Sequence, residues 1–264
     1  MNDVGEEHDA HDAEGAAPGG ADRASAASGG VTPTGLLVID KPVGLTSMDV
    51  CARVRSRLRR GGAPKRIKVG HGGTLDPFAT GVLVVLVGKA TPLCDKIMIG
   101  EKGYRAVCDF SANSTTDDPE GEKTVVEVAT PPTEEMVRAA AAKLVGTIMQ
   151  RPPAFSAIHV NGRRAYEMAR AGEIVELPAR PVQVHELTVV RYAWPEVELF
   201  IRCGKGTYIR SLARDLGASL GVGGMLTALR RTRVGRFEIG QARVLAELPD
   251  PMGQSDLLLV PEDL

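Results

Sequence analysis

Glycines flank a histidine and an aspartate in one short stretch, Lys68-Val-Gly-His-Gly-Gly-Thr-Leu-Asp-Pro-Phe-Ala-Thr-Gly81. Glycine lets the backbone of such a loop approach a ligand closely, and the apolar run 82–87 that follows would hold the loop still. Asp76 is therefore a candidate for nucleophilic or acid–base chemistry, with His71 beside it. The alternative is that Asp76 is an ordinary Asp-Pro turn residue and His71 a loop histidine.

Other patterns in the chain argue against cofactor and metal chemistry. Gly204-Lys-Gly-Thr207 resembles a phosphate-binding loop, but the spacing that a P-loop requires is missing, and no Rossmann glycine pattern follows an apolar run. The four cysteines form no Cys-x-x-Cys pair, which argues against a zinc site and a disulfide framework. We therefore expect no cofactor, no metal and a reducing, cytoplasmic environment.

The elements that must position these residues are of mixed type. Apolar or alternating runs predict strands at 35–40, 82–87, 104–110, 182–184, 197–203, 225–230 and 235–239. Three helices are expected: one over 46–60, capped by Thr46 or Ser47, one capped by Thr133, and one opened by Thr207. Residues 112–123 are interpreted as a polar loop. Because strands and helices do not alternate regularly, we predict an α+β fold, a mixed, largely antiparallel sheet flanked by helices.

The net charge of −1 hides an uneven distribution. Residues 1–33 hold seven acids and one arginine, and residues 249–264 hold four acids and no base. The remainder carries 31 Lys and Arg against 22 Asp and Glu, an excess that suits a polyanionic partner such as RNA. The longest aliphatic run, 82–87, is far shorter than the roughly 20 residues of a membrane-spanning helix.

The helix expected over 46–60 concentrates part of this basic charge. Its arginines lie at positions 53, 55, 57, 59 and 60, off the apolar face. An exposed, solvated face and a surface that contacts RNA are both compatible with this pattern, and both interpretations stay open.

Five separated blocks occur together and in order. They are Gly35-Leu-Leu-Val-Ile-Asp-Lys-Pro-Val-Gly-Leu-Thr-Ser47, Gly70-His with Gly-Thr-Leu-Asp-Pro and Ala-Thr-Gly81, Arg151-Pro-Pro-Ala-Phe-Ser-Ala157, Gly204-Lys-Gly-Thr-Tyr-Ile-Arg210 and Leu229-Arg-Arg231. Together they resemble the bacterial tRNA pseudouridine-55 synthase family, of TruB type. The resemblance covers roughly residues 34 to 240 and implies a pseudouridine synthase fold.

The resemblance implies that the chain isomerises uridine 55 in the TΨC loop of tRNA. The reaction breaks and remakes a base–ribose bond without water, redox equivalents or metal, so one ionised carboxylate suffices, as nucleophile or base. The family places it at Asp76. Because burial would raise the pKa of this carboxyl, a fixed cation should oppose the shift, and the family position for it is Arg210.

The target uridine must be flipped out of the folded tRNA, which costs a few kcal/mol. By resemblance, Tyr104 would stack on the flipped base, Tyr208 would hydrogen-bond near it, and Leu229 would make an apolar contact. His71 would enter the space that the base leaves. Base–aromatic stacking contributes ~1–3 kcal/mol, comparable to the flipping cost.

The resemblance also implies supporting and RNA-binding positions. Lys41 and Pro42 would support the catalytic loop without reacting, since Pro42 fixes a turn after the first strand. Arg163 and Arg164 lie where the family has an RNA-clamping insertion, although a solvated loop explains them nearly as well.

We expect three regions: a disordered acidic tail over 1–33, the catalytic domain over 34–248, and a short acidic C-terminal tail over 249–264 without a complete RNA-binding domain. The partner would be the TΨC stem-loop of tRNA, not a membrane, and a monomer is the simplest expectation. Two rival functions are an RNA-binding chaperone of tRNA folding whose catalysis is secondary or lost, and an unrelated hydrolase. No second carboxylate or His–Ser pair clusters beside Asp76 in the sequence to favour a hydrolase.

Overall fold

The structure, a computed structural model, describes residues 32–156, 158–160, 162–173, 175, 177–262 and 264. The expected tail over 1–33 lies almost entirely outside the described residues. The strands are β1 (Gly35–Lys41), β2 (Val69–His71), β3 (Thr80–Val87), β4 (Lys102–Asp109), β5 (Ala112–Ser114), β6 (Lys123–Val125), β7 (Gly146–Gln150), β8 (His159–Val160), β9 (Arg163–Arg164), β10 (Arg180–Ala193), β11 (Glu196–Cys203), β12 (Met225–Val234), β13 (Phe237–Glu238) and β14 (Arg243–Val244). The α-helices are α1 (Ser47–Arg60), α2 (Cys94–Ile99), α3 (Glu134–Ala142), α4 (Ala165–Arg170) and α5 (Ile209–Ser219).

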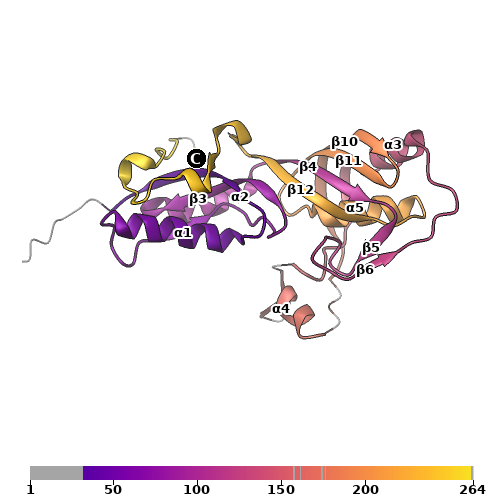
Figure 1. The fold of residues 1–264 in the computed structure, drawn as a ribbon, viewed down its shortest axis with the longest axis horizontal. Helices are drawn as coiled ribbons and strands as arrows, with labels where there is room; N and C mark the ends of the chain where they lie inside the picture. Colours follow the sequence, from indigo (N-terminus) through magenta and orange to yellow (C-terminus); the bar gives the residue numbers. More distant parts are fainter. Residues whose placement is uncertain (1–31, 157, 161, 174, 176, 263) are drawn as a thin grey trace, which may run out of the picture. The chain divides into compact units, whose positions relative to one another are not determined.

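One ten-stranded sheet forms the centre of the described chain, in the order β14-β1-β3-β12-β4-β11-β10-β7, with β2 on β3 and β13 on β12 (Figure 1). The pairs β1–β14 and β3–β12 are parallel, and every other pair in this sheet is antiparallel. The predicted α+β fold with a mixed, largely antiparallel sheet is therefore confirmed.

The unbroken apolar runs of β1 and β3 reflect burial on both faces. Leu37 and Ile39 of β1 pack with α1, whereas Leu36 and Val38 face a second cluster that includes Ile97 of α2. Because neither face meets water, the strands need no polar alternation. The expectation of strands at 35–40 and 82–87 is confirmed.

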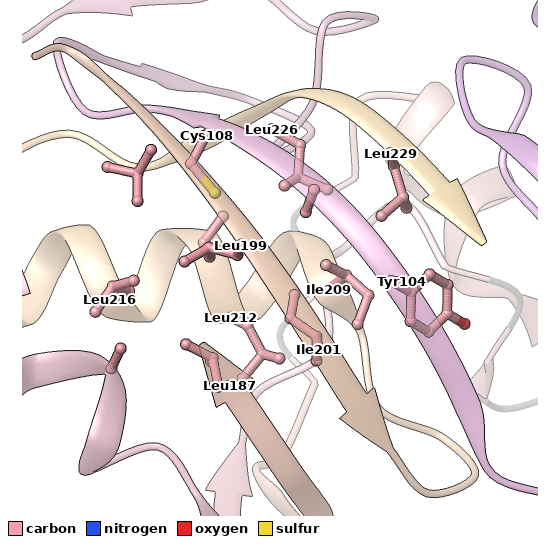
Figure 2. Packing of buried hydrophobic residues seen from close by; sticks show 14 of the residues in the cluster. Tyr104, Cys108, Leu187, Leu199, Ile201, Ile209, Leu212, Leu216, Leu226 and Leu229 are labelled. Carbon is pink, nitrogen blue, oxygen red and sulfur yellow. The ribbon is translucent and has the colours of Figure 1, made fainter. Parts of the chain in front are cut away.

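A larger cluster fills the other half of the sheet, where α5 and α3 lie beside β4, β10 and β11 (Figure 1). The α5 side chains Ile209, Leu212 and Leu216 supply one wall, at the helical spacing seen in the sequence. Figure 2 shows them packed against Leu199 and other strand residues. This packing fixes α5 against the sheet and so fixes the side chains at its N-terminus.

Three expectations need correction. Residues 112–123 are not one loop, because β5 and β6 pair at its ends. The last predicted strand, 235–239, is reduced to the two residues of β13. Helix α5 begins at Ile209, with Tyr208 as its N-cap rather than Thr207.

The segment 249–264 was expected as a tail outside the catalytic domain, but its residues 250–258 contact the body. Leu258 bridges to Leu36 of β1, and Met252 is buried with α1. Asp250 forms an ion pair with Arg60 at the end of α1.

Candidate active site

Asp76 lies in the loop that joins β2 to β3. Strand β2 pairs with the second half of β3, and β12 pairs with its first two residues, through Arg230–Thr80 and Arg231–Gly81. The loop therefore leaves and rejoins the sheet beside β12. Gly81 has φ +105°, and a Cβ there would come within 2.1 Å of the Arg231 carbonyl oxygen. Only glycine allows β12 to approach so closely at this point.

Contacts from α1, from β1 and from the turn between them fix this loop. The Ser47 hydroxyl accepts from the Leu75 amide at 2.9 Å and donates to the Leu75 carbonyl at 3.1 Å. The Pro77 carbonyl accepts from the Lys41 ammonium at 3.2 Å and from the Gly44 amide at 2.8 Å. These bonds fix the backbone on both sides of Asp76.

Arg231 of β12 holds the start of the same loop. Its guanidinium donates to the carbonyls of Thr74 at 3.0 Å and Gly73 at 3.1 Å, and to Val82 at 2.8 Å. Arg231 is buried, and the sequence alone predicted no role for it. A signal was present, because alternation along a strand puts residue 231 on the same face as Leu229.

Arg210 meets the loop from α5. Its Nε lies 3.1 Å from Oδ2 of Asp76, and its Nη1 lies 3.1 Å from Oδ2 of Asp118. The guanidinium also donates to the carbonyls of Thr116 and Phe155, both at 3.0 Å. With its side chain 6% exposed and a partner at each of its three nitrogens, the Arg210 guanidinium is held in a fixed place.

The charge state of Asp76 reflects opposing effects. Burial raises the pKa of its carboxyl above the ordinary aspartate value, and Arg210 is the largest influence in the opposite direction. Asp118 raises that pKa further, whereas Arg231 and Lys41 lower it. The Asp76 side chain is still 32% exposed, which leaves it able to meet a substrate.

Asp76 lines an open pocket of about 960 Å³. The other predicted site residues that line it are His71, Tyr104, Tyr208, Arg210 and Leu229. They come from β2, β4, β12 and the start of α5, so residues as far apart in the sequence as His71 and Leu229 meet here. Lys41 and Pro42 lie outside the lining, although the Lys41 ammonium reaches the loop as described, and it also bonds the Pro42 carbonyl at 2.9 Å.

Tyr104 and Leu229 belong to the apolar wall. In the sheet, Tyr104 of β4 pairs with Arg231 of β12 and with Ile201 of β11. Figure 2 shows Tyr104 at the edge of the cluster near Leu229, with its phenol oxygen directed away from the other labelled side chains. Burial raises the pKa of Tyr104 to about 12, so its phenol stays neutral.

His71 ends β2, and Tyr208 precedes α5. Burial and the nearby Arg231 lower the pKa of His71, which favours the neutral imidazole. The Tyr208 amide donates to Oε1 of Gln150 at 2.8 Å, and its carbonyl accepts from Nε2 of the same side chain at 3.1 Å. The guanidinium of Arg180 lies 5.6 Å from the centre of the Tyr208 ring. Tyr208 is thus positioned by contacts with Gln150 and Arg180 that the sequence did not indicate.

Further lining residues were not predicted at all. Asp118, Lys102, Phe155, Ser156 and Tyr166 each contribute to the pocket. Burial lowers the pKa of Lys102 to about 8, and its ammonium donates to the carbonyl of Met98. Asp118 lies in a turn, Lys102 is the first residue of β4, and Tyr166 lies in α4. Phe155 and Ser156 belong to the block over 151–157, for which the resemblance implied no individual roles.

The arginines of α1 have mostly intramolecular partners. Arg55 donates to the Val69 carbonyl at 3.0 Å, and Arg57 donates to the Leu245 carbonyl at 2.8 Å. Together with the Arg60–Asp250 ion pair, these contacts show that arginines of α1 anchor neighbouring segments of the chain. This role adds to the two that the sequence left open, a solvated face and a surface that contacts RNA.

The two arginines of the expected insertion form β9, which pairs with β8 and leads into α4. The Arg163 guanidinium lies 2.9 Å from a carboxylate oxygen of Glu173. The described part of the chain contains no group of three or more His, Cys, Asp or Glu residues that could hold a metal ion. None of its helices is long and apolar enough to cross a membrane.

Comparison with known proteins gives matches along most of the chain. The family model described as "TruB family pseudouridylate synthase (N terminal domain)" matches residues 60–209, and "tRNA pseudouridylate synthase B C-terminal domain" matches residues 210–256. The tRNA pseudouridine synthase B of Thermobifida fusca (strain YX) is 52% identical over 81% of this chain and 74% of that protein. The protein of the same name from Streptomyces avermitilis is 48% identical over 84% of this chain and 74% of its own length.

Solved structures agree. A chain in the crystal structure of a Cbf5-Nop10-Gar1 complex matches with a TM-score of 0.63 and 29% identity, over 81% of this chain and 53% of that one. This chain thus spans about half the length of the one it matches. A structure of an H/ACA RNP bound to a substrate RNA containing 2'-deoxyuridine matches with a TM-score of 0.60 and 27% identity, over 81% of this chain and 52% of that one. By its sequence matches and its fold, the chain belongs to the TruB family of pseudouridylate synthases.

Proposed function

We propose that this chain converts uridine to pseudouridine at position 55 in the TΨC loop of tRNA, with Asp76 as the reacting carboxylate. The observation that carries the proposal is the ion pair between Asp76 and Arg210, 3.1 Å apart at the wall of a pocket of about 960 Å³. Relatives 48–52% identical are named tRNA pseudouridine synthase B, which supports tRNA as the substrate.

The chemistry needs one carboxylate in a fixed place. The bond between C1' and N1 of uridine breaks, and the electron pair leaves with uracil. In one route, an oxygen of Asp76 bonds to C1' as uracil leaves, and this C1'–O bond breaks again when C5 attacks C1'. In the other, Asp76 takes the C2' proton and a C1'–C2' double bond forms, until C5 adds and C2' regains the proton. In both, uracil turns, C5 bonds to C1', the C5 proton is lost and N1 gains one, so the product is an isomer. A carboxylate paired with a guanidinium can serve either step.

The pocket residues would hold the extruded base. We assign stacking to Tyr104, an apolar contact to Leu229 and a hydrogen bond to Tyr208, and we assign His71 to the space that the base leaves. Support comes from their shared pocket and from the neutral state that burial favours for Tyr104 and His71. Stacking on an aromatic ring contributes ~1–3 kcal/mol, enough to offset much of the flipping cost.

Lys41 and Pro42 are assigned to support of the loop. The Lys41 ammonium bonds the carbonyls of Pro42, Leu45 and Pro77, so it joins the turn after β1 to the residue following Asp76. We assign the catalytic domain to residues 34–248, and propose a monomer that meets the TΨC stem-loop of tRNA in the cytoplasm, where tRNA is found.

The test compares wild type with Asp76→Asn on unmodified tRNA, read by pseudouridine-specific chemical labelling and by tRNA binding. We expect turnover to be abolished and binding to be nearly unchanged, because asparagine keeps the shape and loses the charge. Asp250→Asn, which alters an exposed ion pair with Arg60, is the matched control and should retain turnover. Turnover retained by Asp76→Asn would refute the proposal. If the chain is instead a chaperone of tRNA folding, Asp76 variants should show no defect, whereas Tyr104 and His71 variants should be defective.

A further inference from the structure

Two buried side-chain atoms among the described residues lack a hydrogen-bond partner, Nδ1 of His71 and Oγ of Ser156. Both residues line the pocket that contains Asp76. Buried polar atoms in proteins are nearly always hydrogen-bonded, so each exception requires an explanation. Because both exceptions lie in one pocket, atoms of the bound substrate are the natural partners.

The position of Ser156 is fixed by its neighbours. The residue is 4% exposed. Its amide donates to the Ala154 carbonyl at 3.0 Å, and its carbonyl accepts from the Tyr166 amide at 3.0 Å. The preceding carbonyl, of Phe155, accepts from Arg210 at 3.0 Å. The Phe155 carbonyl therefore links the backbone next to Ser156 to Arg210, the partner of Asp76. Because Ser156 is buried and its backbone is held on both sides, its hydroxyl is shielded from bulk water.

We propose that Ser156 is a substrate-binding residue whose hydroxyl hydrogen-bonds a polar atom of the extruded uridine. This inference rests on the proposed function. A serine hydroxyl can donate to a pyrimidine carbonyl, accept from N3–H, or do either with the ribose 2'-hydroxyl. A pocket that leaves a buried hydroxyl unpaired until the nucleoside arrives gains affinity and favours ligands that carry the matching group. The segment before α4 thus contributes to recognition of the target nucleoside itself.

The experiment uses the full chain with Ser156→Ala, and Ser156→Cys as a second variant that keeps the side-chain volume. We expect about a tenfold loss in kcat/KM on unmodified tRNA, equivalent to about 1.4 kcal/mol. The thermal midpoint should be unchanged or higher, because no hydrogen bond within the protein is lost. A purely structural role would lower the midpoint. Ser219→Ala, which removes a hydroxyl bonded to the Leu216 carbonyl in α5, is the matched control and should keep full activity.

A second arm locates the atom on the substrate. Affinities are measured for tRNA with uridine and with 2'-deoxyuridine at the target position. If Ser156 binds the 2'-hydroxyl, the loss caused by Ser156→Ala disappears on the deoxy substrate; if it binds the base edge, the loss persists. Equal affinity and turnover of Ser156→Ala and wild type would overturn the inference while leaving the proposed function intact. Absence of pseudouridine in the wild-type reaction would instead refute the proposed function.

Discussion

Removal of the Ser47 hydroxyl tests whether fixing the loop backbone matters for catalysis. Ser47 is the first residue of α1 and is buried, and its hydroxyl bonds both the amide and the carbonyl of Leu75. In Ser47→Ala these two backbone groups lose their partner next to Asp76. The side chain of Asp76 itself is untouched, so any effect on chemistry acts through its position.

The magnitudes follow from the two bonds. A neutral hydrogen bond contributes about 0.5–1.5 kcal/mol net, so Ser47→Ala should lower the free energy of unfolding by about 1–3 kcal/mol. For a domain of this size, each kcal/mol lowers the thermal midpoint by about 2–4 °C. A displacement of about 1 Å at a reacting group can cost a hundredfold in rate, so we expect kcat to fall roughly 10- to 100-fold. The tRNA dissociation constant should change little.

The assay is single-turnover pseudouridine formation at saturating enzyme, with tRNA binding and thermal unfolding measured on the same preparations. Thr133→Ala is the matched control, because it removes the N-cap bond of α3, away from the pocket, and costs about 1 kcal/mol. The control should lose stability and keep its rate. If Ser47→Ala loses stability and retains the wild-type rate, the loop does not need this bond to place Asp76, and the reasoning fails.

Substitutions at four further residues separate the effects of charge, loop support and stacking. In Arg210→Gln the acid limb of the pH–rate profile should move to higher pH, because Arg210 opposes the burial that raises the pKa of Asp76. In Asp118→Asn the acid limb should move to lower pH, because Asp118 raises the pKa of Asp76. Lys41→Met leaves three carbonyl oxygens without their shared donor and should cost about 3 kcal/mol in urea unfolding. Tyr104→Ala should weaken kcat/KM by about 1–3 kcal/mol, and Tyr104→Phe by less if stacking dominates.

Local patterns predicted the main elements correctly where local forces decide them. The helix over 46–60 carries its own cap, since Thr46 accepts from the Asp49 amide and Asp49 bonds back to Thr46. The strands at 35–40 and 82–87 are unbroken apolar runs. These signals lie within a few residues of one another, so the sequence contains them directly.

Long-range partners could not be predicted in the same way. Sequence pattern allowed either Thr46 or Ser47 as the cap, and the structure uses Thr46 while Ser47 bonds Leu75 instead. Helix α5 begins at Ile209 and not at Thr207, and the preceding residue, Tyr208, is bonded by Gln150 of β7, 58 residues away. In both cases the decisive partner comes from another element, which composition and periodicity do not reveal.

The same contrast between local signals and long-range partners applies to the candidate site. The blocks that resemble the family identified Asp76 and Arg210, but a resemblance carries only those residues to which it assigns a role. For Arg231 the sequence predicted no role, because its three acceptors are backbone carbonyls of the loop over 72–79 and of β3. Strand alternation could place Arg231 on the face of Leu229, but the backbone acceptors themselves leave no mark in a sequence.

The Arg210 guanidinium contacts two carboxylates, those of Asp76 and Asp118, and their different exposure separates their roles. The Asp118 side chain is 2% exposed and also accepts from the Thr116 hydroxyl and the Glu120 amide. The Asp76 side chain is 32% exposed on the same guanidinium. The Asp118 carboxylate is thus committed to partners within the protein and helps to hold Arg210 in place, whereas the more exposed Asp76 carboxylate remains accessible to a substrate. The contacts of Arg210 with Asp118, Thr116 and Phe155 therefore hold a guanidinium in a fixed place beside Asp76.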